Sequence, residues 1–186
     1  MKRLLPFILI VALIAGCSSN GSDMEHALQL RQKLTSSNGC TFTAVVTADY
    51  VEQVHVFTLA CTSNSAGDVN FEVLEPESIS GITGTIASDG GKLTFDETVL
   101  AFEHLADGQF SPVCAAWVMM RALRSGYLSA CGSDGDYTKL SVDDSYRDDA
   151  MHLEIWLDGA HLPVRAEILW QGRRILSLEV KEFKFL

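Results

Sequence analysis

The sequence predicts an α+β fold in which a large, curved antiparallel sheet packs against a buried helix. Residues 151–185 alternate apolar and polar side chains along three segments that are joined by two glycine-containing turns. A period of two is typical of antiparallel strands with one apolar and one polar face. Because a three-stranded meander is not stable alone, another part of the chain must cover its apolar face. Residues 112–125 supply a candidate, since their helical pattern is apolar on nearly all sides and such a helix must be buried.

The first residues form a targeting segment that lies outside the fold. Lys2 and Arg3 precede a short apolar run, which ends in small residues and then Cys17. The run is shorter than the roughly 20 residues that a membrane-spanning helix needs. This arrangement resembles the lipobox of bacterial lipoproteins, which implies cleavage before Cys17 and attachment of lipid to that cysteine. An ordinary secretory signal, in which Cys17 is incidental, is the alternative.

The length and charge of the chain after the leader indicate one acidic domain on a short tether. We expect a leader over residues 1–16, a lipidated cysteine and polar tether over residues 17–22, and a single domain over residues 23–186. Loss of 16 residues from 186 leaves 170, enough for one domain with a full core. The chain has 14 basic and 24 acidic residues, and loss of two leader cations takes its formal charge from −10 to −12. Such a domain is not expected to bind nucleic acid or to lie flat on anionic lipid.

The elements follow in order along the chain. A helix is expected over residues 23–34, with Ser22-Asp23 as its N-cap. Ser111-Pro112 starts a second helix, because proline after a serine cap is favoured in the first helical turn, and Gly126 ends it. About ten strands are expected, over residues 40–48, 53–61, 69–74, 79–87, 92–95, 99–105, 127–131, 137–142, 151–157, 162–170 and 174–185. The apolar second helix would then occupy the concave side of one curved sheet.

Four cysteines remain apart from Cys17 and allow three pairings. A symmetric hairpin of the first two strands places Cys40 opposite Cys61, and the pairs next to them on the same face are also chemically matched. We therefore predict a Cys40–Cys61 disulfide, which leaves Cys114–Cys131 as the second. Four buried free thiols are the alternative, since cysteine is also a good small core residue.

No motif in the sequence indicates catalysis. The five histidines lack metal-ligand spacing, and neither a Gly-x-Ser-x-Gly elbow nor a glycine-rich phosphate loop is present. A Cys114 nucleophile with His104 or His161 can be drawn, but apolar neighbours favour a structural cysteine. The acidic stretch at residues 143–149 lacks the spacing of a calcium-binding loop. We expect a protein that is not an enzyme and has no metal or cofactor.

The C-terminal meander also carries a family resemblance. Leu157-Asp158, a turn, and Leu162-Pro-Val-Arg-Ala-Glu167 follow one another, after the Ser-Pro-initiated helix and the lipobox-like leader. This order resembles the LolA/LolB-like superfamily of lipoprotein carriers, and most of all its lipoproteins from Gram-positive bacteria. The resemblance implies a half-open β-barrel whose helix-covered concave face binds acyl chains. The arginine-bearing cavity and the protruding apolar loop of family members match no position here, so their residue roles do not transfer.

Two functional hypotheses follow from the resemblance. In the first, the protein is held on the extracytoplasmic face of the cell membrane and binds an apolar or lipid ligand on the concave face. The expected lining residues are Trp117, Met120, Phe42, Phe57, Leu59 and Ile155. In the second, the protein carries no lipid and binds a cell-envelope protein through the outer face or the edge of the sheet. A likeness of fold does not decide between these hypotheses.

Overall fold

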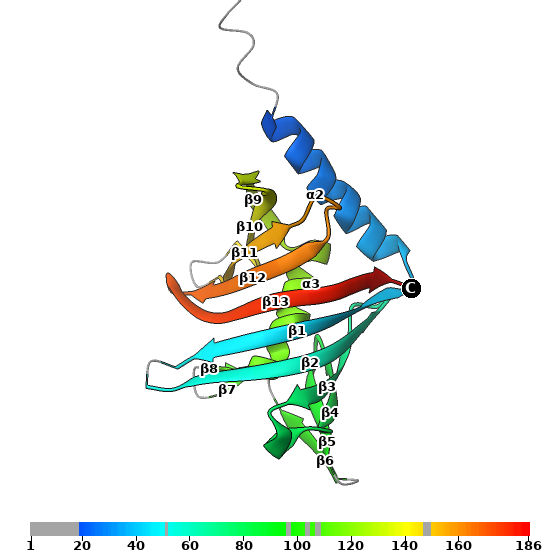
Figure 1. Cartoon of the computed structure of the whole chain (residues 1–186), viewed down its shortest axis with the longest axis vertical. Coiled ribbons are helices and arrows are strands. Elements are labelled where there is room, and N and C mark those ends of the chain that lie inside the picture. The colour runs from blue at the N-terminus through cyan, green and yellow to red at the C-terminus, as the bar shows by residue number, and fades with distance from the viewer. Residues whose placement is uncertain (1–18, 51, 96–97, 103–104, 107–108, 147–149) are drawn as a thin grey trace, which may run out of the picture.

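A computed structural model describes residues 19–186 except 51, 96–97, 103–104, 107–108 and 147–149 (Figure 1). Eleven antiparallel strands form one open sheet in the order β6-β5-β4-β3-β2-β1-β13-β12-β11-β10-β9, and β7 and β8 pair separately. The elements are α2 (Ser19–Ser36), β1 (Gly39–Asp49), β2 (Val54–Asn64), β3 (Val69–Glu75), the 3-10 turn η1 (Glu77–Ile79), β4 (Thr83–Ala87), β5 (Gly90–Phe95), β6 (Thr98–Phe102), β7 (Leu105–Ala106), β8 (Gln109–Phe110), the 3-10 turn η2 (Pro112–Cys114), α3 (Ala115–Ser125), β9 (Tyr127–Asp134), β10 (Tyr137–Asp143), β11 (His152–Leu157), β12 (Pro163–Trp170) and β13 (Arg173–Phe185).

The sheet consists of two sequential halves that meet in its centre. Strands β1 to β6 follow one another outward on one side, and β9 to β13 follow one another inward on the other. The first and last strands pair directly, with Ala44 opposite Val180 and Val46 opposite Leu178. The predicted C-terminal meander is therefore confirmed as β11, β12 and β13, and the predicted α+β class with an open, curved antiparallel sheet is confirmed as well.

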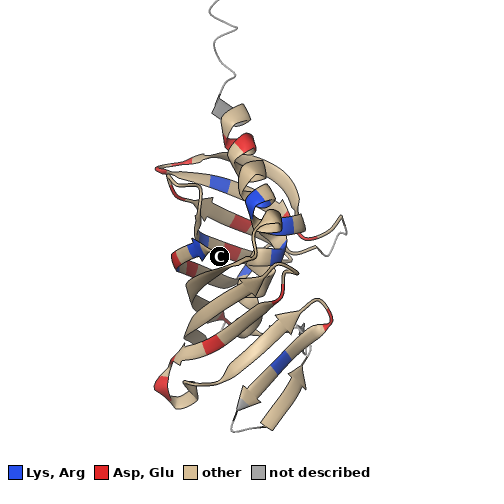
Figure 2. Cartoon of the chain, turned by 90° about the vertical axis from the view of Figure 1, so that its right-hand side faces the viewer, with Lys and Arg blue, Asp and Glu red and all other residues tan. Residues whose placement is uncertain are grey.

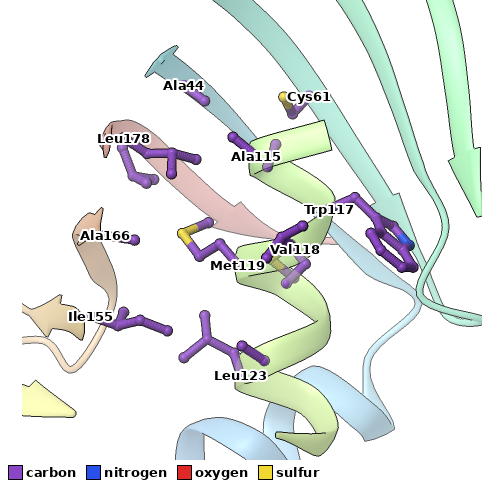
Figure 3. Packing of buried hydrophobic residues seen from close by; sticks show 14 of the residues in the cluster. Ala44, Cys61, Ala115, Trp117, Val118, Met119, Leu123, Ile155, Ala166 and Leu178 are labelled. Atoms are coloured by element: carbon purple, nitrogen blue, oxygen red, sulfur yellow. The ribbon is translucent and has the colours of Figure 1, made fainter. Parts of the chain in front are cut away.

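Helix α3 covers the inner face of the sheet and is buried along most of its length. Its residues from Ala115 to Met120 are at most 3% exposed. Figure 3 shows that Met119 extends toward Leu178 and Ala166, whereas Trp117 lies on the opposite side of the helix. The apolar pattern of residues 112–125 predicted this burial, because a helix without a polar face is stable only inside the protein.

Helices α2 and α3 hold each other through two arginines. Arg31 of α2 donates hydrogen bonds to the carbonyls of Leu123 (2.9 Å) and Gly126 (2.8 Å) at the end of α3. Arg124 of α3 donates in return to the carbonyl of Leu34 near the end of α2, at 2.6 Å. Carbonyls in the last turn of a helix have no partner within it, so each arginine supplies donors that the other helix lacks.

The register of the β1–β2 hairpin differs from the prediction. Cys40 lies opposite Ser63, and Phe42, not Cys40, lies opposite Cys61. The amide of Tyr50 donates to the carbonyl of Gln53, and a hairpin closed at this point has its pairing moved by two residues. A shift of two leaves every side chain on its face, so the alternation alone could not reveal it.

The predicted disulfides are absent. Cys40, Cys61, Cys114 and Cys131 are free thiols, and the first three are buried. The true register removes the facing position on which the Cys40–Cys61 pair was based, and with it the assignment of Cys114–Cys131 by elimination. The structure thus has the free thiols of the alternative, with Cys131 only partly buried.

The start of α2 differs from expectation, whereas the predicted end of α3 at Gly126 is confirmed. Helix α2 includes residues 19–22, which the sequence assigns to the tether, and Leu28 on its expected apolar stripe is 51% exposed. Gly126 does end α3, but with φ −68°, so left-handed geometry is not the reason. A β-carbon there would lie 2.5 Å from Val142 Cγ1 and 2.7 Å from the Ala122 carbonyl oxygen, so the close approach of β10 to the end of α3 excludes a side chain.

Candidate functional site

The predicted lining residues of the concave face do come together, but as packed core. Five of the six are at most 3% exposed and Phe57 is partly buried. The set is Phe42, Phe57, Leu59, Trp117, Met120 and Ile155. No residue of α3 lines the outer groove or the two smaller pockets around Thr47 and Arg174. The side chains of α3 and of the inner face of the sheet therefore pack together in one buried cluster at the place where the ligand was expected.

The buried cysteines lack the chemistry of nucleophiles. Burial raises the pKa of Cys61 and of Cys114 to about 12, and that of Cys40 to about 11. These thiols stay protonated at neutral pH, whereas the thiolate is the reactive form. His161 stacks on His26 of α2 with ring centroids 3.7 Å apart, and His104 lies outside the described residues.

On the outer face of the C-terminal half of the sheet, charged side chains pair with one another. His152 contacts Asp143 (2.7 Å) and Glu154 (2.9 Å) with its two ring nitrogens. Farther along the face, Glu167 accepts hydrogen bonds from Arg165 and Arg174. Burial acts to raise the pKa of Glu167, but these two arginines outweigh it and lower the pKa. Paired groups of this kind leave few free donors for a ligand.

Rising pH should weaken the fold through His152. Burial acts to lower the pKa of His152, but hydrogen bonds and charge from Asp143 and Glu154 outweigh it and raise the pKa. The stabilisation is fully present below the ordinary histidine pKa of about 6.5 and is lost as pH rises through the higher folded value. Urea unfolding on both sides of this window should show the loss in the native chain and not in His152→Gln. An equal pH dependence in both would contradict this assignment.

A groove lies on the outer face of the N-terminal half. It has a volume of about 790 Å³ and runs across strands β13, β1, β2, β3, β4, β5 and β6. Six threonines line it, together with one asparagine, two lysines and two glutamates: Thr41, Thr43, Thr62, Thr83, Thr85, Thr94, Asn70, Lys92, Lys184, Glu72 and Glu182. On strand β1 the threonines of the groove alternate with buried residues, so the groove lies opposite the core.

The edge strand β6 is exposed on both of its faces. Val99 and Leu100, which point to opposite sides, are each 62% exposed. In the sheet, β6 pairs with β5 alone, so its other edge offers unpaired backbone groups. The strand Thr98–Phe102 carries no charged residue and no proline, the features that usually protect an edge. Figure 1 shows β6 at the end of the sheet most distant from α2.

The described residues contain no candidate metal centre and no helix suited to cross a membrane. In the part of the chain that the structure describes, no group of three or more histidine, cysteine or acidic residues is arranged to hold a metal ion. No helix among these residues has both the length and the apolar character needed to cross a membrane. The lipobox cysteine, Cys17, and the leader lie outside the described residues.

Sequence reasoning missed the groove and the edge. One signal was present: the positions between buried residues in β1 include Thr41, Thr43 and Thr47, where charged residues would be more usual on an exposed face. The groove, however, combines residues of six other strands as well, and their registers are set by turns that the pattern does not specify.

Comparison with known proteins gives likeness of structure only. No protein-family model and no curated protein matches the chain. An uncharacterized conserved protein from Thermus thermophilus is 15% identical, with 88% of this chain and 87% of that one covered and a TM-score of 0.49. A LolA superfamily protein, NE2245 from Nitrosomonas europaea, is 8% identical, with 86% and 93% covered and a TM-score of 0.44.

A third similar chain comes from the structure of the CwlD amidase from Clostridioides difficile in complex with the GerS lipoprotein. It is 14% identical, with 88% of this chain and 95% of that one covered and a TM-score of 0.43. At such scores these likenesses carry no function over to this chain. The superfamily that the sequence resembles is nonetheless represented among the similar solved structures.

Proposed function

We propose that this protein is a lipid-anchored component of the cell envelope that binds a protein partner through the exposed edge of its sheet. One observation carries the choice of a protein over a lipid: α3 fills the concave face, with Met119 and Met120 0% exposed. An acyl chain would have to displace this helix and the packed side chains around it, and interior atoms lost from contact are costly.

The exposed edge strand β6 also supports a protein partner. An unpaired strand edge binds an extended segment of another chain by adding it to the sheet, and alternate side chains then give specificity. Val99 and Leu100 offer one apolar contact on each face of such an added strand. The occupant we propose is therefore an extended partner segment with apolar residues on both of its faces. Binding without catalysis also agrees with the protonated, buried thiols.

Leu100→Lys should abolish partner binding without unfolding the protein. The substitution places a charge on the edge strand, which opposes addition of a further strand. Chemical crosslinking of native envelopes should recover a partner with the unaltered chain, and not with Leu100→Lys. The matched control is Val56→Lys, because Val56 is also exposed (52%) but lies on the interior strand β2, far from β6 in the order of the sheet, where it pairs with Thr47 of β1.

Equal recovery with all three chains would exclude β6 as the binding edge. Native mass spectrometry of the full chain in detergent tests the lipid hypothesis directly. We expect the mass of the protein alone, whereas a stoichiometric co-purified lipid, beyond the covalent anchor, would contradict the proposal.

The anchor is tested by Cys17→Ser. Lipid attachment requires the thiol of Cys17, so the variant should leave the membrane fraction or accumulate with its leader intact. The measurement is membrane fractionation followed by intact mass. Cys131→Ser is the control, since Cys131 is the least buried of the four other cysteines. A variant that remains in the membrane fraction after processing would contradict a lipid anchor at this residue.

A further inference from the structure

Two rows of side chains cross the outer groove at right angles to its strands. In the first row, directly paired positions on neighbouring strands run from β13 to β5: Lys184, Thr41, Thr62, Asn70, Thr85 and Lys92. Directly paired residues of antiparallel strands lie on one face, so these six form a continuous line. Five strand spacings separate its ends, which makes it about 24 Å long.

The second row lies one side-chain repeat away along the strands. It runs through Thr43, Ala60, Glu72, Thr83, Thr94 and Val99. At its β13 end lies Glu182, which has a positive φ of 55° where the β1–β13 pairing is irregular. This bulge adds a residue to β13 and brings Glu182 into the lining of the groove.

The polar groups of the groove are largely unengaged. Within the described part of the chain, the hydroxyls of Thr41, Thr62 and Thr94 make no hydrogen bond to another side chain, and Lys92 and Lys184 make no ion pair. Thr85 donates to Asn70 Oδ1 at 2.7 Å, which leaves the amide hydrogens of Asn70 free to point outward. The C-terminal half of the same face differs, because its charged groups pair with one another.

The charges in the groove restrict what it can hold. Two lysines and two glutamates balance, so the groove attracts neither a polyanion nor a polycation, and the chain as a whole has a net charge of −10. Few charges occur on the strands at the foot of the molecule, as Figure 2 shows. Apart from these four charges, the groove presents a long line of threonine hydroxyls and one asparagine amide, which both donate and accept hydrogen bonds.

We propose that this groove binds a neutral, hydroxyl-rich polymer, namely a polysaccharide strand, laid across strands β13 to β5. Each threonine hydroxyl then exchanges hydrogen bonds with sugar hydroxyls, and the two terminal lysines and two glutamates bond to them as charged donors and acceptors. The groove meets the β6 edge proposed for a protein partner at Val99, whereas Leu100 points to the other face and does not line the groove.

A peptide fits this surface less well than a saccharide. An extended peptide is held mainly by backbone hydrogen bonds to an open strand edge. Strands β13 to β5, across which the polymer would lie, are each paired on both sides, so their backbone groups are already used. Apolar side chains are also few in the two rows, where Val99 and Ala60 are the aliphatic residues, and the phenylalanines that line the groove, Phe42 and Phe71, belong to the core.

Titration of the full chain in detergent micelles with a linear N-acetylglucosamine hexamer tests the proposal. Amide resonances of β1 to β5 should shift in a saturable manner. Thr41→Val and Thr62→Val should each weaken binding roughly fivefold, the effect of one lost hydrogen bond. Valine keeps the shape of threonine and favours strands, so the fold is retained. Thr47→Val is the matched control, because Thr47 lies on the same face of β1 but outside the groove, and it should bind as the unaltered chain does.

Three results would overturn the proposal. The first is the absence of saturable shifts with both the N-acetylglucosamine hexamer and a cellulose hexamer. The second is binding that Thr47→Val weakens as much as Thr62→Val, which would place the saccharide elsewhere. The third is shifts in the groove with a neutral glycine–serine peptide of similar length and none with either saccharide, which would make the ligand a peptide.

Discussion

Replacing Met119 by alanine should lower the free energy of unfolding by about 3 kcal/mol. Met119 is 0% exposed and extends from α3 toward Leu178 and Ala166 of the sheet (Figure 3). The substitution removes apolar contacts and leaves a cavity between helix and sheet that the surrounding side chains fill only partly. Urea unfolding monitored by circular dichroism gives the difference, and the slope of the transition should stay unchanged if only stability is affected.

The control for this substitution is Leu28→Ala. Leu28 is also a large apolar residue on a helix, but it is 51% exposed, so the change should cost well under about 1 kcal/mol. Should Met119→Ala be as mild as Leu28→Ala, the concave face would not be tightly packed, and the argument against a lipid ligand would fail. The same two variants therefore test both the core and the observation on which the proposed function rests.

The parts of the fold that the sequence predicted are those in which local pattern and global burial agree. Residues 112–125 form a helix after Ser111-Pro112 and have no polar face until Arg121, so both the helix and its burial follow from the sequence. The three C-terminal strands likewise alternate over most of their length, and the structure buries Leu153, Ile155 and Ile168 on the inner face. In such segments the apolar positions leave only one face for the core.

The parts that could not be predicted depend on contacts between distant segments. The pairing of Phe42 with Cys61 and the predicted pairing of Cys40 with Cys61 put the same residues on the same face, so only the way in which the hairpin closes separates them. The rows of the outer groove were harder still to predict, because they depend on the register of every pair of neighbouring strands from β13 to β6. The sequence of α2 also does not distinguish Arg31 from the exposed Lys33. The hydrogen-bond partners of Arg31 lie 92 and 95 residues away along the chain.

Substitution of Arg31 by methionine should destabilise the protein by about 2 kcal/mol and loosen the contact between α2 and α3. The guanidinium donates to the carbonyls of Leu123 and Gly126 at the end of α3, and at 3.4 Å to that of Ala122, which also accepts the Gly126 N–H. Burial lowers the pKa of Arg31, yet an arginine stays charged, so these are charge-assisted hydrogen bonds. Methionine retains the apolar stem and supplies no donor, so the carbonyls would be left partly buried and unpaired.

Amide hydrogen exchange shows where the loss occurs. In Arg31→Met, protection should fall in α2 and in the last turn of α3, while β1 and β13 at the centre of the sheet stay protected. Gln32→Met is the matched control, because Gln32 neighbours Arg31 on α2 but is exposed. Arg124→Met should act in the same direction, since Arg124 donates to the carbonyls of Leu34 and Ser65 at 2.6 Å each. If α2 kept its protection in both arginine variants, the helix would be held by its apolar contacts through Ala27, Leu30 and Leu34, and the paired arginines would be incidental to the fold.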